Sequence, residues 1–177
     1  GVYSCVLPCS AQLADIRAVQ PMGIIFSGGP ASVLDEGAPR VDEGVFALGV
    51  PVLGICYGMQ LMAHLLGAPV ERGTRREYGR TDVTMDRVDG GLLAGLRPQS
   101  PCWMSHTYQV ARPPEGFMAI AHTADCPVAA MADDAHRLYG VQFHPEAVLT
   151  QYGHELLENF HCICQLWQQE RTEVCYA

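Results

Sequence analysis

One cysteine stands in a sequence context that could make it a nucleophile. Residues 54–60 read Gly-Ile-Cys-Tyr-Gly-Met-Gln, preceded by a short apolar run at 50–53 and followed by an apolar run of helical spacing at 61–66. This pattern predicts a strand, a tight turn and a helix, with Cys56 at the turn. The spacing Gly-x-Cys-x-Gly is a cysteine version of the nucleophile elbow, which reads G-x-S-x-G in serine enzymes.

Such a turn favours a reactive thiolate. Small residues two before and two after Cys56 let a strand turn sharply into a helix, so the side chain is presented at the carboxyl edge of a sheet. The helix then points its N-terminal amides and the positive end of its dipole at the sulfur. The alternative is a buried structural cysteine, because free cysteines are often buried. The turn alone does not decide between the two.

A histidine and a carboxylate that could complete the site follow a later strand. Residues 138–143 are strand-like and run into His144-Pro145-Glu146. A cysteine hydrolase needs a base and a group that orients this base. Because Pro145 fixes one backbone torsion, Glu146 can turn back toward the imidazole of His144. We therefore predict that Cys56, His144 and Glu146 are catalytic, although His-Pro-Glu in isolation is more often a surface turn.

The other six histidines are weaker candidates for the base. His64 lies inside the helix predicted after the cysteine, and His106 ends a strand-like run at 103–106, where we assign it to the substrate side. The remaining four lack a carboxylate in such a restrained position; they are His122, His136, His154 and His161.

A glycine-rich turn supplies a candidate oxyanion hole. Residues 27–30 read Ser-Gly-Gly-Pro and follow a short buried strand at 23–26. Gly28 and Gly29 can bring a bare backbone N–H close to a substrate, and the N–H of Tyr57 gives a second donor. Pro-Ala-Ser follows the glycines, so the Asp of a pyrophosphatase-type ATP loop is missing, and no Walker A pattern occurs. No nucleotide site is predicted in this chain.

The elements around these residues indicate an α/β fold. Strands alternate with helices in the first part of the chain, which is typical of a parallel sheet. Short strands and frequent turns between residues 70 and 131 indicate an antiparallel or mixed part. Because ligand sites gather at the carboxyl ends of strands in open α/β sheets, the three candidate loops are expected to meet there. The predicted strands lie at 2–7, 23–26, 50–53, 81–85, 101–105, 118–121, 127–131 and 138–143, and the helices after Ser10 and at 41–48, 61–66 and 152–167.

Composition narrows the class of protein. The chain has 177 residues, enough for one domain with a substantial core. A net charge of −8 argues against nucleic-acid binding and against an anionic membrane surface. We find no signal peptide and no apolar run of the roughly 20 residues that a membrane span needs. The eight scattered cysteines favour a reducing cytoplasm over a disulfide framework.

A metal site is not predicted. The closest pattern is Cys162-x-Cys164 with His161 beside it, on a helix-like segment. Residues i and i+2 do not share a face of a helix, so ordinary packing is the expected role.

Several separated motifs resemble one family. Residues 54–60, 27–30 and 141–146 together resemble class I (triad) glutamine amidotransferase domains. Finer features narrow the resemblance to the glutaminase domains of GMP synthases, and they lie at residues 57–60, 76–79, 103–106 and 126–131. The resemblance covers nearly the whole chain.

The resemblance implies a fold and a reaction. The fold is a three-layer, flavodoxin-like single domain over residues 1–177, with a mixed, mostly parallel sheet and a small antiparallel portion. The reaction is hydrolysis of L-glutamine through a γ-glutamyl thioester. Ammonia then passes to an ATP-pyrophosphatase (synthetase) domain or subunit that aminates XMP to GMP with ATP and Mg²⁺, which this domain itself does not use. A homodimer through the synthetase domain is one option.

The resemblance also assigns roles position by position. Cys56, His144 and Glu146 form the triad, and the backbones of Gly29 and Tyr57 hold the oxyanion. The expected contacts to glutamine are Gly28, Gln60, Ser105, His106 and Tyr108.

Three departures from the family are visible. The family begins with a further strand and helix, the synthetase domain is not present in this sequence, and Thr107-Tyr108 stands where the family reads Gly-Asp. A threonine there weakens glutamine binding if the glycine serves close backbone approach. Alternatives are the glutaminase subunit of another triad amidotransferase such as anthranilate synthase, a cysteine peptidase or γ-glutamyl hydrolase, and a truncated, inactive binding module.

Overall fold

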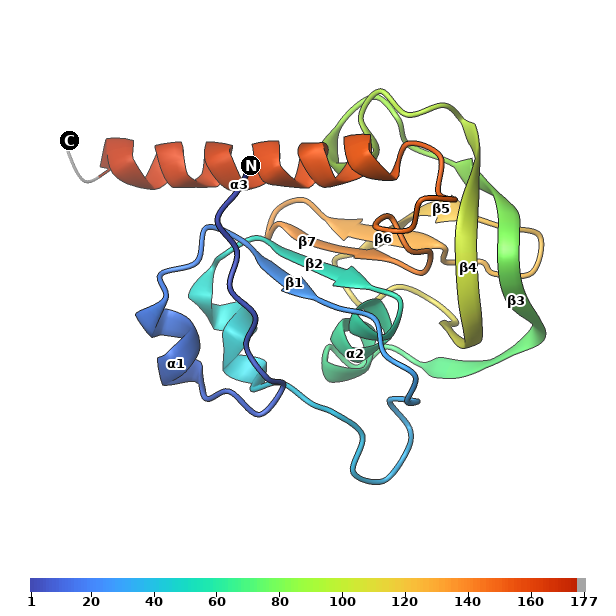
Figure 1. The fold of residues 1–177 in the computed structure, drawn as a ribbon, viewed down its shortest axis with the longest axis horizontal. Helices are drawn as coiled ribbons and strands as arrows, with labels where there is room; N and C mark the ends of the chain where they lie inside the picture. Colours follow the sequence, from blue (N-terminus) through green and yellow to red (C-terminus); the bar gives the residue numbers. More distant parts are fainter. Residues whose placement is uncertain (175–177) are drawn as a thin grey trace.

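The computed structural model describes residues 1–174 and contains one seven-stranded sheet with helices on both of its faces (Figure 1). The strand order across the sheet is β1-β2-β7-β6-β5-β3-β4. The strands are β1 (Ile24–Phe26), β2 (Val52–Ile55), β3 (Val70–Met85), β4 (Gln99–Val110), β5 (Met118–His122), β6 (Ala130–Asp133) and β7 (Leu138–Val141). The helices are α1 (Leu13–Ala18), α2 (Tyr57–Leu65) and α3 (Gly153–Val174), with 3₁₀ turns η1 (Glu43–Leu48) and η2 (Gly91–Leu93).

The pairing of the strands is mixed. β1, β2 and β7 are parallel neighbours, whereas the pairs β7–β6, β6–β5, β5–β3 and β3–β4 are antiparallel. The predicted mixed α/β sheet is confirmed, but the prediction that it is mostly parallel is wrong, since four of the six strand pairs in the described residues are antiparallel. The reason is that β3 and β4 are one long ribbon of 16 and 12 residues, whereas β1 and β2 have only 3 and 4. Residues typical of turns at 86–98 separate these two strands. The alternation of apolar and polar residues that predicts a strand is interrupted within each of them.

Two hydrophobic cores lie on the two faces of the sheet. Successive residues of a strand point to opposite faces, and in β2 Val52 packs in the core with Met59 and Met62 of α2. Leu53 packs in the other core with Leu156 of α3. All of these side chains are fully buried. The sheet is therefore the middle of three layers, with α2 and α3 on opposite faces.

The first residues differ from the prediction. Residues 2–7 form no strand, and their side chains are exposed, so the predicted strand is wrong. A strand needs a neighbour to take its backbone hydrogen bonds, and β1 pairs with β2 alone within the described residues. The following helix begins at Leu13 rather than after Ser10, because Asp15 accepts a hydrogen bond from the backbone N–H of Gln12.

The last helix is longer than predicted. α3 runs to Val174, and Leu156, Phe160, Cys164 and Trp167 are buried side chains at helical spacing within its described part. Leu166, on the same helix, is 58% exposed. No helix in the described part of the chain is long and apolar enough to cross a membrane.

The packing of α2 on β1 makes a stability prediction. A β-carbon at Gly58 would lie 2.1 Å from the carbonyl oxygen of Phe26. Gly58→Ala would therefore push α2 away from the sheet, and we expect the free energy of unfolding to fall by at least about 2 kcal/mol. Denaturant unfolding measures this loss. Gly90→Ala is the control, since nothing lies within 4 Å of its β-carbon; an equal loss in both variants would contradict the packing argument.

Candidate active site

The turn that carries Cys56 has a strained backbone. Cys56 has φ 51° and ψ −105°, outside the regions that residues with a side chain usually occupy. The close packing around it requires glycine on both sides: a β-carbon at Gly54 would lie 2.6 Å from the backbone nitrogen of Met59, and the space beside Gly58 is smaller still. Gln60 N–H donates to the carbonyl of Cys56, so helix α2 starts directly at the cysteine.

Neighbouring strands bring the histidine to the cysteine. β7 lies parallel to β2 with Ile55 opposite Val141, so the residues that follow the two strands meet at one edge of the sheet. The backbone of His144 is held on both sides: its N–H donates to the carbonyl of Trp103, and its carbonyl accepts from the hydroxyl of Thr150 at 2.6 Å. The ring is therefore carried by a fixed loop.

Cys56, His144 and Glu146 come together in the structure. Nδ1 of His144 lies 2.7 Å from Oε1 of Glu146, which leaves Nε2 for the thiol. A hydrogen bond with Cys56 is the largest cause that raises the pKa of His144 to about 9; burial opposes it, and Glu146 adds to the rise. An imidazolium beside the sulfur favours the thiolate. Chemically, Cys56 could serve as a nucleophile, His144 as a proton carrier and Glu146 as the carboxylate that orients the ring.

Besides the buried His106, three exposed histidines also have carboxylate partners. His122 pairs with Asp86 at 2.8 Å, and His136 and His154 pair with carboxylates at 2.7 and 3.1 Å. Their side chains are 46%, 75% and 82% exposed. What distinguishes His144 among these pairs is therefore the thiol beside it and not the carboxylate.

The glycine turn lies over the same edge of the sheet. A β-carbon at Gly28 would be 3.0 Å from Cε1 of His144 and 3.7 Å from Cβ of Cys56. Gly29 lies against the ring of Tyr57, at 3.7 Å from a β-carbon placed on it. Both glycines are thus beside the reactive groups, and the oxyanion role of the amides stays a prediction.

The segment 105–108 approaches the thiol from the antiparallel ribbon. The carbonyl oxygen of Ser105 lies 3.7 Å from Sγ of Cys56. Nε2 of Gln60 donates to the carbonyl of Tyr108 at 2.7 Å. Thr107, where the family reads glycine, shares a hydrogen bond with the hydroxyl of Tyr78. The predicted contact residues Ser105, Gln60 and Tyr108 are therefore close to the cysteine or to one another.

His106 has a different setting from the one expected. It lies within β4, not at a strand end, and its Nε2 is 3.0 Å from Oε2 of Glu77, directly opposite on β3. Nδ1 contacts the carbonyl of Tyr108, and the hydroxyl of Thr123 donates to the second oxygen of Glu77. The ring of His106 is only 2% exposed, and both of its nitrogens contact groups of the protein.

The carboxylate of Glu77 was missed by the sequence reasoning. Burial raises the pKa of Glu77, but the hydrogen bonds from His106 and Thr123 outweigh it, so the pKa is lowered overall. Sγ of Cys126 also lies near this pair. The side-chain atoms of Glu77, His106 and Cys126 that could bind a metal ion are within 4.8 Å of one another. A β-bulge between Arg72 and Glu77 sets this register.

Gln142 is a second residue that was missed. Its side chain is fully buried, with Nε2 at 3.5 Å from Sγ of Cys56 and Oε1 accepting from Gln60 at 3.0 Å. A signal existed: an amide inside an otherwise apolar strand-like run, two residues before His144, must find polar partners when buried.

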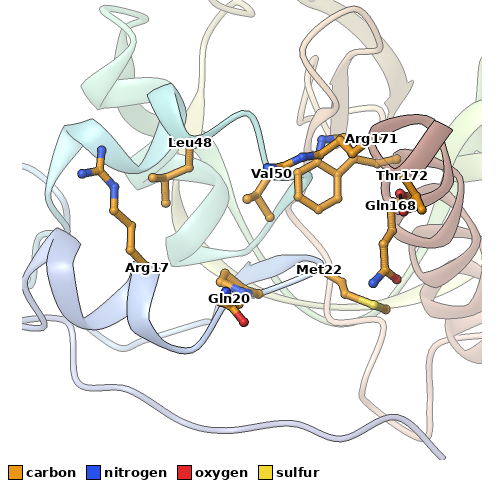
Figure 2. Close-up of a pocket in the computed structure, with 10 residues that line it drawn as sticks. Arg17, Gln20, Met22, Leu48, Val50, Gln168, Arg171 and Thr172 are labelled. Carbon is orange, nitrogen blue, oxygen red and sulfur yellow. Dashed lines mark hydrogen bonds between the residues drawn. The ribbon is translucent and has the colours of Figure 1, made fainter. Parts of the chain in front are cut away.

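A cavity of about 560 Å³ lies elsewhere in the molecule (Figure 2). Met22 and Val50, which precede β1 and β2, line it together with Arg171 of α3. It is therefore at the amino ends of the parallel strands, whereas Cys56 stands at their carboxyl ends.

Comparison with known proteins identifies the family to which the chain belongs. The family model described as "Glutamine amidotransferase class-I" matches residues 1–164, and the chain belongs to this family. The chain is 54% identical over 160 residues to a GMP synthase [glutamine-hydrolyzing] of Acetivibrio thermocellus, covering 90% of this chain and 31% of that protein. A second, from Clostridium perfringens, is 52% identical over 94% of this chain and 33% of its own. The chain spans about a third of the length of these relatives.

Two solved structures have the same fold as this chain. A Thermoplasma acidophilum protein, described as one of the subunits of a GMP synthase, superimposes with a TM-score of 0.77 at 29% identity, over 85% of this chain and 76% of that one. A glutamine amidotransferase of Thermotoga maritima shares the fold, with a TM-score of 0.64 at 21% identity over 78% and 60% of the two chains.

The thiol–imidazole contact predicts a change in protonation. In Cys56→Ala the pKa of His144 should fall from about 9 toward its ordinary value near 6.5, because the largest cause of the rise is removed. Glu146→Gln should lower the pKa by less. Since the pKa is raised in the folded state, the stability that protonation adds is complete below about pH 6.5 and is lost as the pH rises to about 9. NMR titration of the ring protons measures this; an unchanged pKa in Cys56→Ala would refute the contact.

The buried pair on the ribbon predicts a loss of stability. Glu77→Leu leaves the ring of His106 without its carboxylate partner, and we expect the free energy of unfolding to fall by about 2–4 kcal/mol at pH 7. Because the pKa of Glu77 is lowered in the fold, this contribution is present above about pH 4.5 and declines as the pH falls below that. Chemical denaturation at several pH values checks both points.

Glu71→Leu is the matched control for Glu77→Leu, since it lies on the same strand and is exposed. Its effect should stay within about 0.5 kcal/mol. Equal effects of the two substitutions would mean that the buried pair adds nothing.

Proposed function

We propose that this chain hydrolyses L-glutamine to glutamate and ammonia. The observation that carries the proposal is the convergence of Cys56, His144 and Glu146 beside the glycine turn, in a chain of the class-I amidotransferase family. A thiolate with an imidazolium next to it is the reactant pair that a γ-amide requires: a nucleophile for the carbonyl carbon and a proton for the departing nitrogen.

The first half of the reaction forms a thioester. Sγ of Cys56 attacks the γ-carbonyl carbon, and the negative charge that develops on the oxygen is stabilised by the amides of Gly29 and Tyr57. The C–N bond then breaks as His144 transfers its proton to the nitrogen, which leaves as ammonia. Glu146 keeps the ring oriented throughout and stabilises its charged form.

The second half releases glutamate. His144, now neutral, accepts a proton from water, and the oxygen attacks the thioester carbon. The C–S bond breaks, and the thiolate and the imidazolium are regenerated together. Gly28, Gln60, Ser105 and Tyr108 are proposed to surround the glutamine during both halves, and His106, whose ring is buried against Glu77, holds this part of β4 in place.

We further propose that the ammonia serves the amination of XMP to GMP. The support is the description of the relatives as GMP synthase [glutamine-hydrolyzing], of which this chain matches about a third. The other two thirds of such a protein would hold the ATP-pyrophosphatase (synthetase) part, with its ATP and Mg²⁺. A cytoplasmic location belongs to this proposal, since the nucleophile must remain a free thiol.

Replacement of the nucleophile tests the proposed reaction. Cys56→Ala should lower the rate of glutamate release from L-glutamine by roughly a thousandfold or more, because no thioester can form. Cys162→Ala, which removes an exposed cysteine, should leave the rate unchanged. Mass spectrometry should find an adduct of a glutamine-analogue electrophile on Cys56 alone. Full activity in Cys56→Ala would exclude the mechanism.

A synthetase partner tests the rest of the proposal. With a synthetase part supplied, Cys56→Ala should abolish GMP formation from glutamine and preserve GMP formation from free ammonia. Amination of chorismate in place of XMP would point instead to an anthranilate synthase partner.

A further inference from the structure

One buried amide contacts the nucleophile directly. Gln142 follows β7, its side chain is 0% exposed, and its backbone N–H donates to the carbonyl of Ala129. Its Nε2 lies 3.5 Å from Sγ of Cys56, which is within hydrogen-bonding reach of the larger sulfur atom. The reaction described above makes no use of this group.

The hydrogen-bond network determines which end of the amide faces the sulfur. Nε2 of Gln60 donates to the carbonyl of Tyr108 at 2.7 Å and to Oε1 of Gln142 at 3.0 Å. A carbonyl only accepts, so Gln60 must present its NH₂ group to both partners. Gln142 therefore turns its oxygen to Gln60 and its own NH₂ group to Cys56.

A donor in this position discriminates between the two forms of the sulfur. A hydrogen bond to an ionised acceptor is about twice as strong as one to a neutral acceptor, and burial strengthens it further. A thiol would leave the N–H of Gln142 with a weak acceptor in a dry environment, which is costly. The contact therefore favours the thiolate over the thiol.

We propose that Gln142 is a further catalytic residue, whose side-chain N–H stabilises the Cys56 thiolate and fixes its position. This role rests on the proposed thiolate chemistry of Cys56. Through Gln60 the amide also reaches the backbone of Tyr108, so the nucleophile and the proposed glutamine contacts belong to one network.

The charged groups near the sulfur, within the described residues, come as two pairs. His144, with Glu146, faces it from the loop after β7. His106, with Glu77, lies one residue beyond Ser105 on the ribbon, whose carbonyl contacts Sγ. Neither pair is altered by a change at residue 142, so a shift in the titration of the thiol can be assigned to the amide.

The sharpest test is Gln142→Glu in the full chain. The variant keeps the shape of the side chain and the oxygen that accepts from Gln60, but it replaces the N–H donor with a second oxygen and adds a negative charge when the carboxyl group is ionised, so it is read together with the uncharged Gln142→Leu. The pH profile of Cys56 alkylation by iodoacetamide should move upward by about one unit or more. Peptide mass spectrometry isolates the signal of Cys56 from the exposed Cys5, Cys9 and Cys162. The kcat for glutamine should fall roughly tenfold or more, with a smaller change in KM.

Two further variants complete the design. Gln142→Leu, which removes both polar groups, should shift the profile in the same direction. Gln109→Leu is the matched control: Gln109 is a buried glutamine on β4, 4% exposed, and it should leave the profile unchanged. Thermal unfolding establishes that each variant is folded, and if Gln142→Leu is not, the uncharged Gln142→Met takes its place, because Gln142→Glu alone does not separate the lost donor from the added charge.

The outcomes separate this inference from the proposed function. Alkylation needs no turnover of glutamine, so a shifted profile in a chain without glutaminase activity would refute the proposed reaction and leave the Gln142 contact standing. An active chain whose profile is the same with and without Gln142 would overturn the role of Gln142 alone.

Discussion

The site depends on a backbone turn that most residues cannot make. Cys56 lies in a region of φ and ψ that costs of order 1–3 kcal/mol, and the fold around it supplies this energy. Gly54 and Gly58 let the strand, the turn and α2 approach one another to distances at which any β-carbon would collide with backbone. The N–H of Cys56 donates to the carbonyl of Val141, so the parallel neighbour β7 also holds the turn in place. The thiol is therefore presented at the sheet edge by packing that tolerates no larger residue on either side.

The groups around the sulfur arrive from two different kinds of strand pairing. Parallel pairing of β2 with β7 brings Gln142 and His144 to the thiol, since both strands end at the same edge. The antiparallel ribbon of β3 and β4 brings the carbonyl of Ser105 from the other side, and the buried pair of Glu77 and His106 fixes that part of the ribbon. In this mixed sheet the site is therefore bordered by the long antiparallel ribbon as well as by the loops that follow the parallel strands.

Charge and burial are balanced at this edge. The proposed reaction needs a thiolate, which would be costly in a dry site by itself, and the groups beside Cys56 that can offset this cost are the ring of His144, the side-chain N–H of Gln142 and the N-terminus of α2. The raised pKa of His144 has its largest cause in the hydrogen bond with Cys56. Glu146 and the backbone contacts of His144 hold the ring in place beside the thiol.

Local sequence patterns are enough to predict the strand, turn and helix around Cys56, the glycine turn after β1, and a histidine held beside a carboxylate. These are encoded within a few residues, because glycine, proline and hydrophobic spacing act on the nearest backbone. The remaining contacts depend on the tertiary structure. Residues 2–7 have the pattern of a strand but pair with no neighbour among the described residues, and the exposed His122 contacts the carboxylate of Asp86 from a distant part of the chain. The register of the bulged ribbon placed Glu77 against His106, and the parallel register placed Gln142 against the sulfur, since contacts between distant segments depend on how strands align and not on what either segment prefers alone.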